Sequence, residues 1–382
     1  MTAAHEVPQG EVERRVGALR ERLAAAGLER ALLTSEPNVH YLSGIRTPSF
    51  HSNSRPLALV VPVDGPTVLV CSRSQAPNAE ATAWVGDIAP FEGFEAEAVT
   101  VLTDLLQGAG VGPVAAELGD DTRPGVSGSS LMTLQRDVGP LADVAPCLWE
   151  LRTVKSDWEI AALREAGRIN GAAFDAARAA YRPGMTERDV YAVWGSAVMA
   201  SGADSPGYLA MHSGPGNYRR VSGLAGDRVL TEGDLLWLDG GPRWRGYWSD
   251  VTRTFAVGEP QAGHQDLYAA SRAATYAVMA ASGPGLSTTD LFDVVARAFR
   301  DAGLEIGSAT RIGHGLGLQL TEPPSLLPSV PVRLAPGMVL AVEPGIARPD
   351  GYFNVEENFL VTADGAELVS APSAPTILTL GA

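Results

Sequence analysis

Four apolar segments in the C-terminal half of the chain carry acidic residues where buried strands are expected. They read LLWLDGG, GYWSDVTRTFAV, MVLAVEPGI and NVEENFLVT, and they contain Asp239, Asp250, Glu343 and the pair Glu356 and Glu357. A carboxylate is costly to bury unless it is paired or bound to a metal. Neighbouring antiparallel strands can bring Asp239 and Asp250 side by side. The four segments therefore predict one shared metal site.

A single histidine completes this set of candidate ligands. His314 lies in RIGHGLGLQLTEPPS, among three glycines that let the backbone pass close to a ligand. Taken one at a time, these acidic and histidine side chains are more typical of turns, exposed surface or a structural histidine. Taken together, carboxylates and one imidazole suit Mn²⁺, Fe²⁺, Co²⁺ or Zn²⁺. The set has enough oxygens to bridge two ions.

Length and charge narrow the class of protein further. A chain of 382 residues exceeds one ordinary core, so two domains are expected. The net charge of −15 repels phosphate backbones, so nucleic acid is not an expected partner. Two distant cysteines, Cys71 and Cys147, fit a reducing compartment better than a disulfide framework. Without a recognisable signal peptide or membrane-spanning run, we expect a cytoplasmic protein with no membrane partner.

The hydrophobic pattern changes near residue 150. Residues 1–150 alternate predicted helices and strands, beginning with a helix over 11–26, which indicates an α/β domain. Residues 151–382 repeat an order of two helices followed by strands, which predicts an α+β domain with two halves of similar build. The expected helix starts are a capping box at Ser156, Thr186, and either Ser287 or Thr288.

Five motifs in order resemble the pita-bread superfamily, which includes creatinase, prolidase, aminopeptidase P and methionine aminopeptidase. LTEGDLLWLDGGPRWRGYWSDVTRTFAVG is similar to the first two ligand strands, and GHGLGL, LAPGMVLAVEPGI and VEENFLVTADG resemble the other three motifs. PNVHYLSGI and LRTVKSDWEIAALREAGRI extend the resemblance toward the N-terminus. It implies a creatinase-like α/β N-terminal domain, then an α+β pita-bread catalytic domain with an internal pseudo-two-fold repeat.

The resemblance also implies a site for two divalent ions, with Mn²⁺ expected ahead of Fe²⁺, Co²⁺ or Zn²⁺. The implied ligands are Asp239, Asp250, His314, Glu343 and Glu356. Counting back from the end of the last motif assigns the bridging position to Glu356 and the next position to Glu357. Glu343 is expected to shuttle protons as well as to bind metal.

Three positions depart from the pattern of the superfamily's peptidases. Thr321 stands seven residues after His314, where the peptidases have a second histidine. Val221 or Ser222 occupies the place of another histidine, about seventeen residues before the first aspartate. Asn354 replaces an arginine that is common in proline-specific members. Because such groups bind the scissile carbonyl or stabilise an oxyanion, we expect poor cleavage of ordinary Xaa-Pro dipeptides.

Other residues are candidates for the missing roles. His212 and Thr321 are the candidate catalytic replacements, beside Glu343. The candidate substrate contacts are Tyr218, Arg219, Arg220, Ser222 and Asn354. The two arginines suit a substrate carboxylate, which arginine binds through two parallel hydrogen bonds, but solvated surface charge is an equally good interpretation.

These observations favour a dinuclear metal hydrolase that cleaves a C–N bond in a short peptide or small peptide-like molecule. A metal-dependent lyase acting on a small carboxylated metabolite is the alternative. A non-catalytic binding protein fits less well, because all five ligands are retained. The resemblance further implies a homodimer built through residues 1–150, with Arg46, His51 and Arg55 as candidates to reach a neighbouring site; a plain surface loop is the alternative.

Overall fold

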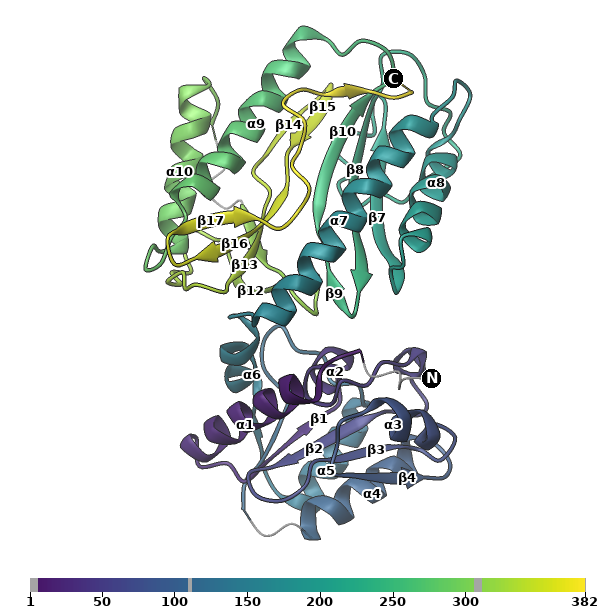
Figure 1. Ribbon diagram of the computed structural model, residues 1–382, viewed down its shortest axis with the longest axis vertical. Helices are drawn as coiled ribbons and strands as arrows, with labels where there is room; N and C mark the ends of the chain where they lie inside the picture. Colours follow the sequence, from purple (N-terminus) through teal and green to yellow (C-terminus); the bar gives the residue numbers. More distant parts are fainter. Residues whose placement is uncertain (1–5, 109–111, 306–310, 382) are drawn as a thin grey trace. The chain divides into compact units, whose positions relative to one another are not determined.

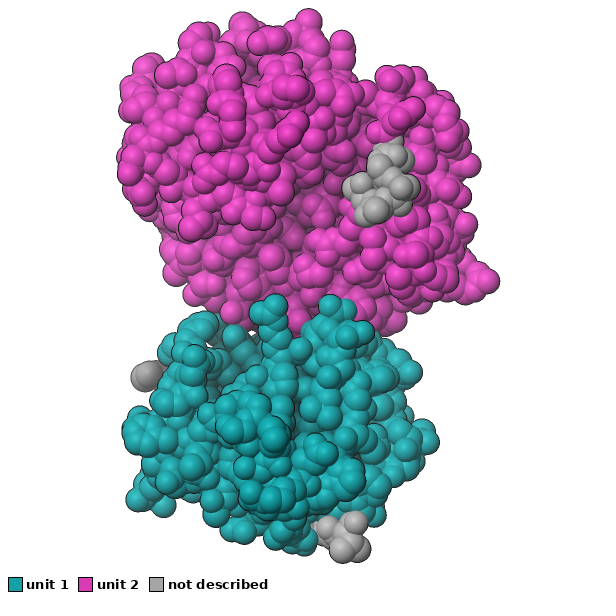
Figure 2. Space-filling model, turned by 180° about the vertical axis from the view of Figure 1, so that it is seen from behind, with its two compact units in different colours: residues 1–152 teal, residues 153–382 magenta. Residues whose placement is uncertain are grey.

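The computed structural model describes residues 6–108, 112–305 and 311–381. The chain divides into two compact units, residues 1–152 and 153–382, which Figure 2 shows in different colours. The sequence interpretation placed this boundary after residue 150. In the structure it falls at the end of a helix, α6 (Ala145–Arg152).

Unit 1 is built on a six-stranded mixed sheet with the strand order β4-β3-β2-β1-β5-β6 (Figure 1). The strands are β1 (Arg30–Leu33), β2 (Ala58–Pro62), β3 (Val68–Ser72), β4 (Asp87–Phe91), β5 (Val114–Ala116) and β6 (Leu141–Asp143). The other helices are α1 (Gln9–Ala25), α2 (Glu36–Ser43), η1 (Pro48–His51), α3 (Ala76–Thr82), α4 (Glu95–Gly108) and α5 (Gly128–Val138). β1–β2 and β2–β3 pair antiparallel, and the remaining pairs are parallel.

The apolar residues of these strands alternate between the two faces of the sheet, as the period of two along a strand requires. Leu32, Val60 and Val70 join Leu102 of α4 and Leu134 of α5 in one buried cluster. Helix α1 contacts β1, β2, α2 and α6 instead. Unit 1 is therefore the α/β unit that the sequence predicted.

The described residues of unit 2 form two five-stranded sheets and one hairpin. The first sheet has the order β18-β10-β8-β7, with β9 paired to β8, and the second has the order β12-β11-β13-β16-β17. The strands of the first sheet are β7 (Ser205–Ser213), β8 (Leu235–Trp244), β9 (Tyr247–Trp248), β10 (Val251–Ala256) and β18 (Leu378–Thr379). The others are β11 (Gly313–Gly315), β12 (Glu322–Ser325), β13 (Val339–Val342), β16 (Glu357–Thr362) and β17 (Gly365–Leu368), with β14 (Gly345–Arg348) and β15 (Gly351–Asn354) as the hairpin.

Two pairs of helices accompany these sheets: α7 (Asp157–Ala180) with α8 (Glu187–Ala200), and α9 (Ala262–Ala281) with α10 (Thr288–Asp301). Ser156, Thr186 and Ser287 cap α7, α8 and α10, each in a capping box with the acidic residue three positions later. These caps satisfy backbone N–H groups that a helix start leaves without partners. Ser287 rather than Thr288 is thus the cap of α10.

Each helix pair packs on a buried core of its own, and the core of α9 and α10 also includes Leu235 of β8 and Ala256 of β10. Residues of α7 and α8 pack with β7, β8 and β10, and residues of α9 and α10 pack with β13 and β16. Figure 1 shows the repeated order of helix pair and antiparallel strands along the chain. The structure thus has the two halves of similar build that the sequence predicted. Within the described residues, none of the helices combines the length and apolar character needed to cross a membrane.

Candidate metal centre

The two predicted aspartate ligands lie on neighbouring strands of the first sheet. Asp239 of β8 pairs with Thr252 of β10, and Asp250 directly precedes β10. The hydroxyl oxygen of Tyr208, on β7, lies 2.7 Å from Oδ1 of Asp239 and 2.5 Å from Oδ1 of Asp250, so its single proton is shared between the two carboxylates. Antiparallel pairing therefore brings these carboxylates side by side, as expected from their spacing.

His314 enters from the second sheet, at the middle of β11 between β12 and β13. A Cβ at Gly313 would lie 2.1 Å from the carbonyl oxygen of Ala341, and one at Gly315 would lie 2.3 Å from that of Pro323. Glycine is therefore required on both sides of His314 because the flanking backbones approach too closely for any side chain.

The imidazole of His314 is oriented toward the carboxylates. Its Nδ1 lies 2.9 Å from the carbonyl oxygen of Gly315, and its Nε2 lies 3.3 Å from Oδ2 of Asp250 and 4.0 Å from Oε1 of Glu343. Ligand atoms of Asp250, His314 and Glu356 all lie within 4.8 Å of one another. A backbone hydrogen bond at one ring nitrogen with the other nitrogen directed at the site is the arrangement of a metal-ligating histidine.

Glu356 and Glu357 face different surroundings. Oε2 of Glu356 accepts a hydrogen bond from Thr252 Oγ1 at 2.9 Å, beside the aspartates. Oε2 of Glu357 pairs with Arg253 Nη2 at 3.1 Å and accepts from Ser370 Oγ at 2.7 Å. The structure therefore places Glu356 in the cluster and gives Glu357 a separate, buried ion pair.

Burial and mutual repulsion raise the pKa values of the carboxyl groups in the cluster. Burial, and next the charge of Asp250, raise the pKa of Asp239 and that of Glu356 well above the ordinary range of carboxyl groups. Burial also raises the pKa of Glu343, against the opposing effect of His314 and Arg311. Such crowding is unfavourable unless cations neutralise it. The donor set of four carboxylates and one imidazole fits divalent metal ions.

Tyr208 and Thr252 are site residues that the sequence reasoning did not identify. Both hold carboxylates of the cluster through the hydrogen bonds given above. The alternation along β7 could have indicated Tyr208, because Tyr208, Ala210 and His212 share one face of the strand. Ala210 pairs with Asp239, so this face is the one that carries the aspartate. The pairing of β7 with β8, which sequence alone leaves open, was needed to recognise it.

His212, which the sequence suggested as a catalytic replacement, has the surroundings of a buried supporting residue. It is only 1% exposed, and its ring stacks on Trp237 with centroids 4.7 Å apart. Its Nδ1 lies 3.2 Å from the carbonyl oxygen of Arg220, and its Nε2 is buried without a hydrogen-bond partner among the described residues. Burial lowers the pKa of His212 to about 4, so the ring is neutral at physiological pH.

Asn354 also lies behind the carboxylates, and it is 1% exposed. Its Oδ1 accepts from Trp237 Nε1 at 2.5 Å, and its Nδ2 donates to Thr252 Oγ1 at 3.4 Å. Thr252 in turn holds Glu356. Because both ends of the amide are engaged, its surroundings are those of a positioning residue and not of the expected substrate contact.

The remaining candidate substrate contacts lie in the loop after β7, where their surroundings differ. Tyr218 is 4% exposed, and its hydroxyl accepts the backbone N–H of Leu235 at 3.1 Å, so it belongs to the core and does not face a substrate. Arg219 and Arg220 are exposed at the surface, and neither lines the pocket described next. Ser222, in contrast, is one of the residues that line it.

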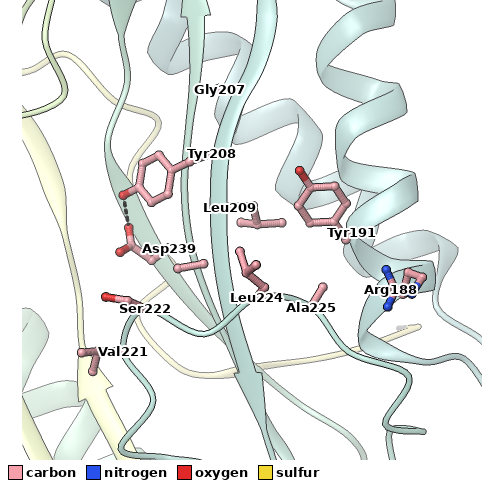
Figure 3. A pocket seen from close by; sticks show the side chains of 11 residues that line it. Arg188, Tyr191, Gly207, Tyr208, Leu209, Val221, Ser222, Leu224, Ala225 and Asp239 are labelled. Atoms are coloured by element: carbon pink, nitrogen blue, oxygen red, sulfur yellow. Dashed lines mark hydrogen bonds between the residues drawn. The ribbon is translucent and has the colours of Figure 1, made fainter.

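A pocket of about 500 Å³ adjoins the cluster on the β7 side. Figure 3 shows that Asp239, Tyr208 and Ser222 form one end of it and that Arg188 lies toward the other. Its apolar lining is provided by Tyr191, Leu209, Ala210, Val221, Leu224 and Ala225. Both candidates for the place of the superfamily's histidine, Val221 and Ser222, thus border this pocket.

Thr321 directly precedes Glu322, which forms a buried ion pair with Lys155. Nζ of Lys155 lies 3.3 Å from Oε2 of Glu322, and both side chains are 1% exposed. Oε1 of Glu322 also accepts the backbone N–H of Gln319 at 3.0 Å. Thr321 itself is half-buried and does not line the pocket, so its expected catalytic role stays a prediction.

The three candidates for a neighbouring subunit's site lie around η1 in unit 1. Arg46 forms an ion pair with Glu6, and the guanidinium of Arg55 lies 5.3 Å from the ring centroid of Phe94. His51 is exposed at the end of η1. Their contact with a second subunit stays a prediction.

Sequence comparison assigns both units to known families. Residues 161–363 match metallopeptidase family M24, and residues 15–154 match the creatinase/prolidase N-terminal domain. The chain belongs to metallopeptidase family M24, and it is a metal-dependent hydrolase with the two-domain pita-bread fold expected from its motifs.

Individual relatives span nearly the whole chain. The probable dipeptidase PepE of Mycobacterium tuberculosis is 32% identical in an alignment of 375 residues that covers 94% of each chain. The crystal structure of dipeptidase PepE from Mycobacterium ulcerans has a TM-score of 0.83 at 26% identity, covering 98% of this chain and 99% of that one. An Xaa-Pro dipeptidase from Bacillus anthracis has a TM-score of 0.85 at 25% identity, covering 97% and 100%.

Proposed function

We propose that this protein is a dinuclear metal-dependent hydrolase that cleaves the C–N bond of short peptides, and that ordinary Xaa-Pro dipeptides are poor substrates. The observation that carries the proposal is the cluster of acids with raised pKa values and one inward-facing imidazole beside a pocket. The residues that would hold the two ions, with Mn²⁺ expected first, are Asp239, Asp250, His314, Glu343 and Glu356.

Bound divalent ions supply Lewis acidity and lower the pKa of water at the site. The chain's own groups supply positioning and proton transfer. Glu343 is the more accessible acid, with 24% of its side chain exposed against 5% for Asp250. Its Oε1 is therefore better placed than the Asp250 carboxylate to accept a proton and to return it to the leaving amine. Tyr208 orients Asp239 and Asp250 because its hydroxyl lies within hydrogen-bond distance of both carboxylates.

The pocket supports a substrate with an apolar side chain. Leu209, Leu224 and Tyr191 contribute to a lining that is mostly apolar, and Asp239 stands at one end. A concave apolar site with a few convergent polar groups is the usual form of a small-molecule site. An apolar side chain held there would place its peptide bond beside the carboxylates.

By resemblance, the chain lacks two histidines and an arginine that the superfamily's peptidases use on the peptide. The matching positions hold Val221 or Ser222, Thr321 and Asn354, and none of these carries a positive charge. Loss of one oxyanion donor costs roughly 3 kcal/mol in other hydrolases. We therefore expect kcat/KM for Ala-Pro and Gly-Pro at least about 100-fold below an ordinary value of roughly 10⁴ M⁻¹s⁻¹.

The test is turnover by chelator-treated protein that is reloaded with Mn²⁺ and offered two panels of dipeptides. One panel carries leucine or phenylalanine at either position, and the other consists of Xaa-Pro dipeptides. We expect metal-dependent release of amino acids from the first panel and at most weak release from the second. Glu343→Gln should abolish turnover, while the matched variant Glu357→Gln, outside the cluster, should retain it.

Efficient cleavage of Ala-Pro would contradict the proposed specificity. Reaction in H₂¹⁸O decides the reaction class, because hydrolysis places the label in the new carboxylate. An unsaturated product without label would indicate the metal-dependent lyase instead.

A further inference from the structure

We propose that Arg311 binds the terminal carboxylate of the substrate. This inference rests on the proposed function, because it assigns the group that recognises the charged end of a short peptide. Proline-specific members of the superfamily often have an arginine at the position of Asn354 in this chain. Arg311 lies at a different position.

Arg311 lies at the solvent-facing edge of the cluster. It is three residues before His314, and its Nη2 lies 3.5 Å from Oε1 of Glu343. The side chains of Arg311 and Glu343 are 39% and 24% exposed, whereas those of His314 and Asp250 are 3% and 5% exposed. A molecule that approaches the carboxylates from solvent can therefore reach this guanidinium.

When metal ions neutralise the carboxylates of the cluster, the positive charge of Arg311 is available to bind a substrate carboxylate. The four carboxylates of the cluster carry four negative charges, which two divalent ions neutralise. Glu343 then no longer depends on Arg311 for compensation, and the guanidinium remains as a net positive charge at the edge of the site. A planar guanidinium with paired N–H donors is the group best suited to bind a carboxylate.

The other cations have different surroundings: Arg188 lies toward the far end of the pocket and is paired with Asp227, and the rest are paired elsewhere or do not line the pocket. Arg253 is paired with Glu357, and Lys155 is buried with Glu322. Arg219 and Arg220 are exposed but do not line the pocket. Among the lysines and arginines in the described parts of the chain, only Arg311 forms an ion pair with a predicted metal ligand.

The location also suits a peptide that spans the cluster. Arg311 and Glu343 flank β11 and β13 of the second sheet, whereas the apolar pocket is bordered by β7 and β8 of the first. A dipeptide that crosses the carboxylates can place an apolar side chain on one side and its charged end on the other.

The experiment compares Leu-Leu with its C-terminal amide as substrates of the Mn²⁺-loaded enzyme. Arg311→Met removes the charge at similar length, Arg311→Lys keeps it, and Arg220→Met is the matched exposed control. We expect Arg311→Met to raise KM for Leu-Leu by about 10- to 100-fold, with little change in kcat and no effect on the amide. Arg311→Lys should recover part of the loss, and Arg220→Met should change neither substrate.

A binding measurement keeps this inference separate from the proposed reaction. Calorimetry with free leucine and leucinamide should show that the wild-type protein prefers leucine and that Arg311→Met removes the preference, with unchanged metal content. If Leu-Leu is not cleaved but this preference depends on Arg311, the proposed function fails and the inference stands. Equal losses on acid and amide, loss of metal in Arg311→Met, or the same effect from Arg220→Met would each overturn it.

Discussion

Glu356 and Glu357 are adjacent in the sequence and equally buried, yet they face opposite environments. Alternation along a strand sends the first toward the aspartates and the second toward Arg253. One carboxylate is thus held among like charges, and the other is compensated by an opposite charge. The two residues should therefore respond differently to removal.

We expect Glu356→Ala to lose bound metal and Glu357→Ala to retain about two ions per chain. Glu357→Ala should instead lower the free energy of unfolding by about 3–5 kcal/mol, because the largely buried Arg253, 11% exposed, loses its carboxylate partner. Elemental analysis after desalting and urea unfolding of the metal-free proteins measure the two effects. Full metal content in Glu356→Ala would rule out its assignment as a ligand.

The buried imidazole of His212 makes stability depend on pH. Its pKa is about 4 in the folded protein and 6.5 for an ordinary histidine. As the pH falls through 6.5, the unfolded chain binds a proton that the folded protein does not bind until about pH 4. The stability present above pH 6.5 is therefore lost on acidification, by up to roughly 3 kcal/mol.

His212→Phe keeps an aromatic ring for stacking on Trp237 and removes the titrating group. We expect the free energy of unfolding of this variant to fall less steeply than that of the wild type between pH 6.5 and 4. Urea titrations at several pH values measure the slopes, and His51→Gln, at an exposed site in unit 1, is the control. Equal slopes in wild type and His212→Phe would disprove the contribution.

At the scale of elements, the pair Lys155–Glu322 joins the entry of α7 to the start of β12. Lys155 directly precedes the cap of α7, and Glu322 follows the loop after β11. A buried charge without its partner costs far more than a pair removed as a whole. The pair therefore keeps the segment that carries Thr321 in place.

We expect Lys155→Met to lower the free energy of unfolding by about 3–5 kcal/mol and the double variant Lys155→Met/Glu322→Leu to recover much of that loss. A double-mutant cycle by urea unfolding provides the coupling energy. Arg188→Met, which breaks the exposed pair with Asp227, should change stability little because solvent screens that pair. Additive losses in the cycle would show that the two charges do not interact.

At the scale of the whole molecule, the two units have separate buried cores, and all five predicted ligands belong to unit 2. Metal should therefore stabilise unit 2 alone. At a free concentration of 100 times the dissociation constant, the stabilisation is about 2.7 kcal/mol for one site.

We expect two thermal transitions, of which only that of unit 2 moves to lower temperature when a chelator is added. Five of the seven tryptophans lie in unit 2, so intrinsic fluorescence follows that transition and calorimetry detects both. A chelator shift in both transitions, or in neither, would contradict the placement of the metal centre.

We also expect a homodimer, or a higher even assembly, built through residues 1–150, on the basis of the resemblance to creatinase and prolidase. Light scattering should give twice the chain mass of 39.9 kDa, or a higher even multiple of it. A protein that remains a monomer at working concentration would refute this expectation.

The sequence by itself determined the local features of this protein. The sequence predicted the capping residues Ser156 and Thr186, the apolar strands and the five motifs. Each of these features depends on residues only a few positions apart. The same patterns predicted the family, which the comparisons confirmed, and the paired placement of Asp239 and Asp250.

Only the tertiary structure decided which side chains meet across the sheets. It turned Tyr208 toward two aspartates, buried His212 and Tyr218 away from the pocket, and placed Arg311 beside Glu343. The physical reason is that burial and pairing arise from strands far apart in the chain. A residue's type and spacing predict the chemistry it can perform, but contacts between distant segments decide whether it faces a substrate, a metal ligand or the core.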